Sequence, residues 1–165
     1  MYWFYVIYTA ILFTTAVGMS ILAVYAWRQP HNRRTKWITV FLSLSSILAF
    51  NFILIQFSTD ANTMFFWARL RFLFIAPVPV LSFLIVINHL DMDRWVKPRH
   101  LALFAIVPII TNIIIWAAPQ YFWSDWTFVR SEFLSLETPS YTGWYQIHVF
   151  YSYAMFVATA VVLLQ

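Results

Sequence analysis

The amino-acid sequence of this 165-residue chain contains no cysteine and only two glycines, Gly18 and Gly143. Without cysteine the chain cannot form a disulfide, and its thiol content says nothing about the compartment. Two widely separated glycines cannot build a glycine-rich phosphate-binding loop. The sequence therefore excludes disulfide scaffolds and the nucleotide-binding proteins that depend on such a loop.

Charged residues are also scarce, at 10% of the chain, whereas 62% of the residues are hydrophobic and 21% are aromatic. This composition is typical of a helical membrane protein, and the length fits one domain. The net charge of +4 comes from basic residues that cluster beside apolar runs. Such clusters indicate membrane topology, so we predict no nucleic-acid partner.

The groups that intramembrane chemistry requires are missing from the apolar runs. Both lysines, Lys36 and Lys97, lie in connections, so no lysine is placed to form a retinal Schiff base. The histidines lie at different depths, which disfavours a bis-histidine haem site. No carboxylate lies inside an apolar run to relay protons, and no serine has histidine and acid partners at a recognisable spacing. We predict no enzyme activity, no cofactor and no metal site in this chain.

Five apolar segments are long enough to cross a bilayer as helices. They cover about residues 2–27, 37–57, 64–90, 101–118 and 144–164. The sequence thus predicts an all-α, polytopic bundle of five transmembrane helices. We treat residues 1–165 as one transmembrane domain and expect it to be the front part of a longer protein, because the fifth span runs to Leu164.

The connecting segments differ in charge. The connections at residues 28–36 and 91–100 hold four and three Lys/Arg residues, whereas those at 58–63 and 119–143 hold none and one. Positive residues remain on the cytoplasmic side of membrane proteins. The N-terminus is therefore predicted outside and the C-terminus inside, with the aromatic segment 119–143 outside at headgroup level.

The third span carries features that a lipid-facing helix would not need. Arg69 and Arg71 lie near its outer end, and an arginine inside hydrocarbon costs at least ~2.5 kcal/mol. Pro77 and Pro79 lie near its middle and leave backbone carbonyls without their helical donors. We predict that this span is the centre of the bundle. A static kink at the prolines and a hinge that couples the two membrane sides both remain open.

Five polar residues lie at a similar depth, about 6–11 Å below the outer boundary at ~1.5 Å per residue. They are Asn51, Arg69, Arg71, Asn112 and His148. Two interpretations remain open: an outward-opening polar cavity that binds a small ligand or ion, and a hydrogen-bonded layer that fixes helix packing. Positions i and i+2 point about 200° apart on a helix, so the two arginines cannot both face one pocket squarely.

The sequence FFWARLRFLFIAPVPVLSFL, Phe65–Leu84, resembles the third-helix signature of the N-terminal seven-transmembrane sensor region of bacterial histidine kinases. The stretches YAWRQPHNRR, Tyr25–Arg34, and GWYQIHVFYSY, Gly143–Tyr153, are similar to the corresponding places of that family. The resemblance implies a multi-pass sensor in the bacterial cytoplasmic membrane. Its relatives continue into cytoplasmic PAS, histidine kinase or diguanylate cyclase domains. This chain departs from the family by ending after five spans.

The expected function is therefore the sensory input domain of a two-component signalling protein. It would detect an extracellular or membrane-borne signal and transmit it to a cytoplasmic output domain absent from this chain. The candidate ligand-binding residues are Asn51, Arg69, Arg71, Asn112 and His148. Pro77 and Pro79 are the candidate coupling residues, and a homodimer is compatible with the sequence. The alternatives are a small transporter or channel subunit with an outward-facing polar cavity, and a purely structural membrane partner.

Overall fold

The computed structural model describes residues 2–29, 33–92, 97–130 and 135–164, and six α-helices occupy most of them. The helices are α1 (Tyr2–Arg28), α2 (Arg33–Phe57), α3 (Ala61–Ile75), α4 (Val78–His89), α5 (Pro98–Ala117) and α6 (Gly143–Leu163). Helices α3 and α4 form one span, Ala61–His89, so that five spans are long and apolar enough to cross a membrane. The predicted five-span helical bundle is confirmed.

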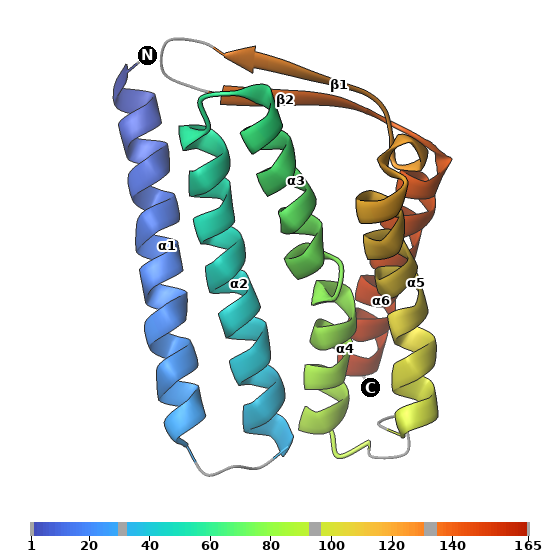
Figure 1. Cartoon of the computed structure of the whole chain (residues 1–165). Helices are drawn as coiled ribbons and strands as arrows, with labels where there is room; N and C mark the ends of the chain where they lie inside the picture. The colour runs from blue at the N-terminus through green and yellow to red at the C-terminus, as the bar shows by residue number, and fades with distance from the viewer. Residues whose placement is uncertain (1, 30–32, 93–96, 131–134, 165) are drawn as a thin grey trace.

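The span formed by α3 and α4 lies in the middle of the bundle (Figure 1), and more of its apolar stretch is buried than in any other span. It is interrupted between Ala76, the last residue with an α3 hydrogen bond, and Pro77. The Ala76 amide donates to the Phe72 carbonyl at 3.1 Å, and the regular pattern resumes where the Leu81 amide donates to the Pro77 carbonyl at 3.0 Å. Pro79 lies in the first turn of α4, where its missing N–H costs no helical bond.

Helices α1 and α2 pack closely because small residues face each other. Ala16 is fully buried, and the Ser46 hydroxyl donates to its carbonyl at 2.9 Å. The hydroxyls of Ser46 and Ser20 lie 2.6 Å apart. Small and hydroxyl-bearing residues at a membrane helix contact allow the backbones to approach and form interhelical bonds.

A β-hairpin follows α5, and the sequence analysis did not predict it. The chain passes through a short 3-10 helix, η2 (Pro119–Tyr121), into β1 (Trp123–Arg130), which pairs antiparallel with β2 (Ser135–Tyr141). Aromatic and β-branched residues from Trp126 to Val129 favour an extended strand, and Pro119 stops α5. The hairpin lies across one end of the bundle (Figure 1), within the segment predicted to lie at headgroup level.

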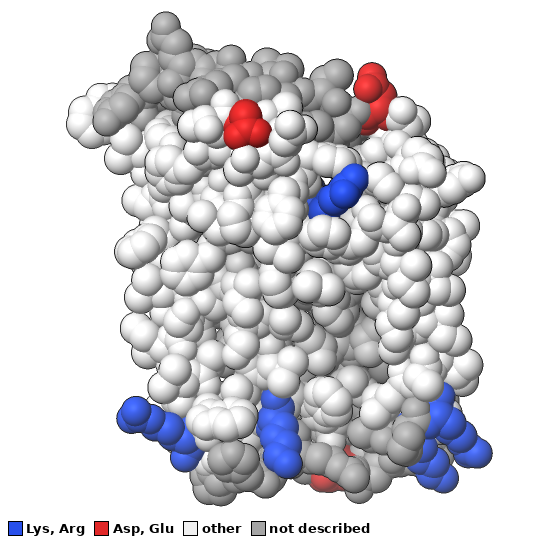
Figure 2. Space-filling model, in the orientation of Figure 1, with Lys and Arg blue, Asp and Glu red and all other residues white. Residues whose placement is uncertain are grey.

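The two ends of the bundle differ in charge. We call the end that carries the hairpin and Asp60 the hairpin end, and the opposite end, with Arg28, Lys36, Lys97 and Arg99, the basic end. Figure 2 shows most of the basic side chains along the lower edge and acidic side chains at both the upper and the lower edge. Between the edges this face is almost entirely uncharged, apart from a basic side chain in its upper part. Large apolar side chains are exposed along this belt, among them Phe150 and Leu103, as expected for a surface in contact with lipid.

Candidate functional site

A polar contact near the hairpin end joins α5 to α6 through Thr111, which is fully buried. The indole Nε1 of Trp144 donates to the Thr111 hydroxyl at 3.2 Å. The same hydroxyl lies 3.3 Å from Nδ1 of His148. Because an indole can only donate, the hydroxyl accepts from Trp144 and its proton is free to bond Nδ1. Three side chains thus form one chain of hydrogen bonds between two helices.

An aromatic cluster covers this contact. Phe122 is fully buried after η2, and its ring centroid lies 4.8 Å from that of Phe72 on α3 and 4.7 Å from that of Trp123. The His148 ring packs edge-on against Phe72 at 6.4 Å. The base of the hairpin therefore closes the bundle over α3, α5 and α6, and His148 lies beneath that closure.

Asp60 caps the start of α3 at the same end of the bundle, just outside the third span. Its carboxylate accepts a hydrogen bond from the Thr63 amide at 2.9 Å. This bond, strengthened by the positive end of the helix dipole, lowers the pKa of Asp60 below its ordinary value. The carboxylate is thus held by the helix that carries the two arginines.

Arg69 and Arg71 lie on different sides of α3, as their spacing required. The Arg69 guanidinium is 4.1 Å from the centroid of the Phe65 ring, whose other neighbour is Trp123 of the hairpin. The Arg71 guanidinium is 5.4 Å from the Phe52 ring on α2 and equally far from Phe72. Each cation therefore rests on aromatic faces, which attract it electrostatically.

Arg69 has a buried donor for which the described residues supply no acceptor. Its Nε has no hydrogen-bond partner within the part of the chain that the structure describes. The guanidinium stacks on the ring of Phe65. Burying a guanidinium donor without an acceptor raises the free energy of the fold. A ligand that supplies an acceptor would lower it.

Asn51 and Asn112 also carry unsatisfied atoms. Asn51 is only 2% exposed, and neither its amide oxygen nor its amide nitrogen has a partner among the described residues. Asn112 is half-buried, and its Nδ2 donates to the Pro108 carbonyl at 3.0 Å within α5. Its Oδ1 is buried and has no partner in the described ranges.

The structure thus brings together only part of the predicted layer. His148 pairs with Thr111, a residue that the sequence analysis missed, and Trp144 completes that contact. The two arginines diverge, and Asn51 lies on α2, away from the Thr111 contact. The signal for Thr111 was weak, because a threonine in a helix can bond its own backbone; its position beside Asn112, three residues after Pro108, was the available hint.

The arrangement of five apolar spans with polar side chains paired between helices defines a polytopic helical membrane protein. Chemically, the site offers aromatic-stacked cations, amide groups and an imidazole–hydroxyl pair. Within the described residues no group of three metal-ligating side chains comes together.

A family model, the N-terminal 7TM region of histidine kinase, matches residues 1–165. The chain belongs to this family, and it is a membrane sensor region rather than a catalytic domain. Membership implies a lipid environment and a cytoplasmic output domain. No curated protein and no solved structure matches the chain.

Proposed function

We propose that this chain detects a small-molecule or membrane-borne ligand at its hairpin end and transmits the signal to a cytoplasmic output domain. The observation that supports this is the architecture of the third span. A single span carries both arginines near the hairpin end, is interrupted at Pro77 and leads to the basic end. The family match supports the sensory role.

The proposal places the hairpin end outside and the basic end in the cytoplasm. The bias of Lys and Arg toward the basic end supports this orientation. The absence of native cysteine allows a direct test by labelling intact cells with a membrane-impermeant thiol reagent. We expect a cysteine at the exposed position Ser124 to be labelled. A cysteine at Asn32, which lies outside the described residues, should be labelled only after the cells are permeabilised; labelling of Asn32→Cys in intact cells would reverse the orientation.

Transmission would use the interruption at Pro77. A ligand can shift the third span only by binding one arrangement of α3 and α4 more tightly than another. Replacing Pro77 and Pro79 with alanine restores two backbone donors and favours a continuous helix. In the full-length protein we expect basal autophosphorylation in membrane vesicles to change by about fivefold, which corresponds to ~1 kcal/mol.

The control for this experiment is Pro108→Ala, which removes a proline from the interior of α5, outside the third span. It should leave basal autophosphorylation near the wild-type level at equal expression. An unchanged output in the Pro77→Ala/Pro79→Ala variant would mean that the break in the third span is a static kink. An equal change in Pro108→Ala would mean that the output responds to any loss of proline from the bundle.

A further inference from the structure

A donor and an acceptor that have no partner among the described residues lie at the contact between α3 and α5. They are Arg69 Nε and Asn112 Oδ1, and both atoms are buried. The ring of Phe66 on α3 lies 6.0 Å from that of Trp116 on α5, which fixes the level at which the two antiparallel helices meet. One helical turn further from the hairpin end, α3 places Arg69 and α5 places Asn112. The two side chains therefore lie at the same level of this contact.

The directions of the two residues agree with this placement. On α3, Arg69 lies between the exposed position Phe66 and the buried position Phe72, and on α5, Asn112 lies between the exposed Trp116 and the buried Ile115. Both residues are half-buried, so part of each side chain faces the outside of the contact while Arg69 Nε and Asn112 Oδ1 lie beneath its surface.

The hydrogen-bond inventory defines the chemistry that would fit. Arg69 offers a cationic N–H donor and requires an acceptor, for which an oxyanion is the strongest. The Asn112 amide nitrogen is committed to the Pro108 carbonyl, so the free atom is the oxygen, which requires a donor. A matching ligand therefore presents an oxyanion with a hydroxyl beside it.

The depth of the guanidinium indicates where such a ligand resides. A side chain on a helix points back toward the helix N-terminus, and the Arg69 guanidinium indeed lies over the ring of Phe65. Phe65 is one turn from the start of α3, about 6 Å at 1.5 Å per residue. Arg69 thus reaches toward headgroup depth, and exposed apolar residues continue below it, Leu73 on α3 and Ile109 on α5.

We propose that Arg69 and Asn112 form a site for the headgroup of an anionic lipid that carries a hydroxyl next to its phosphate, such as a phosphoglycerol headgroup. The phosphate accepts from Arg69, the glycerol hydroxyl donates to Asn112, and the acyl chains lie along Leu73 and Ile109. The link from this site to signalling rests on the proposed sensory function, whereas lipid binding does not.

Native mass spectrometry of the full chain, released from dodecyl maltoside micelles, tests the site directly. The probes are phosphatidylglycerol, phosphatidylcholine, which has a phosphate but no donor, and water-soluble glycerol phosphate. We expect the wild-type chain to retain one phosphatidylglycerol in preference to phosphatidylcholine. Arg69→Gln should weaken retention about tenfold, a loss of ~1.4 kcal/mol, while the matched control Arg71→Gln should stay within about twofold.

Asn112 gives two further variants that do not remove the arginine. Asn112→Leu should abolish the preference for phosphatidylglycerol over phosphatidylcholine. Asn112→Asp would give Arg69 an internal carboxylate, so it should reduce lipid retention as Arg69→Gln does. Equal losses of phosphatidylglycerol retention in Arg69→Gln and Arg71→Gln would overturn the site, because any positive charge would then attract the lipid equally well. Unchanged retention of phosphatidylglycerol and phosphatidylcholine in both Asn112 variants would also overturn it.

The remaining outcomes separate the source of the ligand and the two proposals. If glycerol phosphate binds as tightly as the lipid, the ligand comes from water and the lipid assignment is wrong. If lipid retention follows the expected pattern but phosphatidylglycerol does not change autophosphorylation of the full-length protein, the site is confirmed and its link to sensing is wrong. If the wild-type chain does not retain phosphatidylglycerol, but the Pro77→Ala/Pro79→Ala variant still changes autophosphorylation, the lipid site is wrong and the proposed sensory function is unaffected.

Discussion

Replacing Thr111 with valine tests whether the contact between α5 and α6 stabilises the bundle. Thr111 is fully buried; its hydroxyl accepts a hydrogen bond from the Trp144 indole and contacts His148 Nδ1. Valine keeps the shape of threonine, so the substitution removes both hydrogen bonds without opening a cavity. Interhelical bonds in membrane proteins contribute ~0.6 kcal/mol each on average and up to ~1.7. We expect Thr111→Val to lower the free energy of unfolding by about 1–2 kcal/mol.

The measurement is equilibrium unfolding in mixed micelles, followed by the loss of helical circular dichroism. Thr159→Val is the matched control, because the Thr159 hydroxyl donates to the Met155 carbonyl of its own helix at 2.7 Å, within α6. A double-mutant cycle with His148→Leu isolates the pair, and a coupling energy of at least ~0.5 kcal/mol is expected for residues in contact. Equal effects of Thr111→Val and Thr159→Val, with no coupling to His148, would refute the reasoning.

Two further predictions concern single polar groups. Asn51→Leu should raise the free energy of unfolding by about 1 kcal/mol. Both buried amide atoms lack partners among the described residues, and leucine removes the cost of desolvating them. A loss of stability in the same unfolding assay would show that the amide is hydrogen-bonded. Asp60→Ala should lower the melting temperature at neutral pH, since the Thr63 amide loses its acceptor. The pKa of Asp60 is lowered in the folded state, so its contribution is complete above the ordinary carboxyl pKa and disappears as the pH falls through the folded value. The difference between wild type and Asp60→Ala should therefore vanish in acid, and a difference that persists there would contradict this origin.

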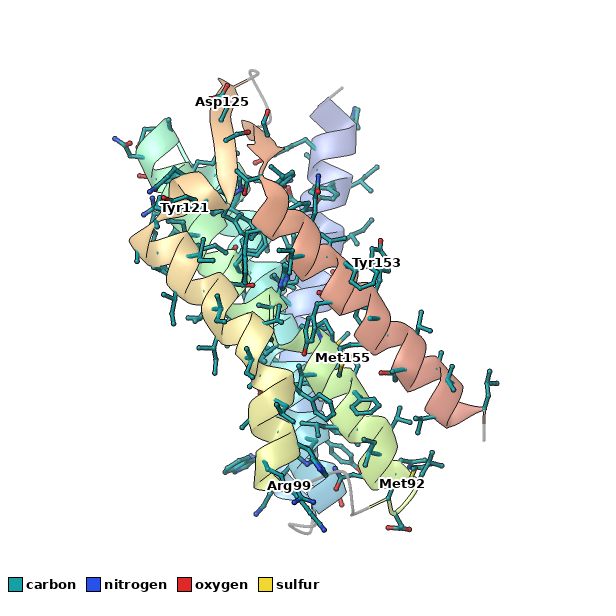
Figure 3. All side chains as sticks on the ribbon, turned by 90° about the vertical axis from the view of Figure 1, so that its right-hand side faces the viewer. Met92, Arg99, Tyr121, Asp125, Tyr153 and Met155 are labelled. Atoms are coloured by element: carbon teal, nitrogen blue, oxygen red, sulfur yellow. The ribbon has the colours of Figure 1, made fainter. Side chains whose placement is uncertain are left out.

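The side view of the bundle illustrates how packing decides which spans meet. Figure 3 shows α5 and α6 diverging away from the hairpin end, with Met155 directed toward α4 and Tyr153 directed outward. Met155 packs with Phe83 and Ile87 of α4. The Tyr151 hydroxyl donates to the Phe104 carbonyl of α5. A single turn of α6 thus contacts α4 and α5, which no pattern in its own sequence predicts.

The sequence by itself determined the five spans and the central place of the third, because the transfer of each side chain into hydrocarbon depends mainly on that side chain. It also determined that Arg69 and Arg71 would diverge, since helix geometry is fixed. Tertiary structure alone decided that Thr111 pairs with His148 and that the segment after Pro119 forms a hairpin over the bundle. These outcomes depend on how each helix is rotated and on which neighbour it meets. Helix rotation and helix neighbours are set by the packing of all spans together, so the hydropathy of a single span does not predict them.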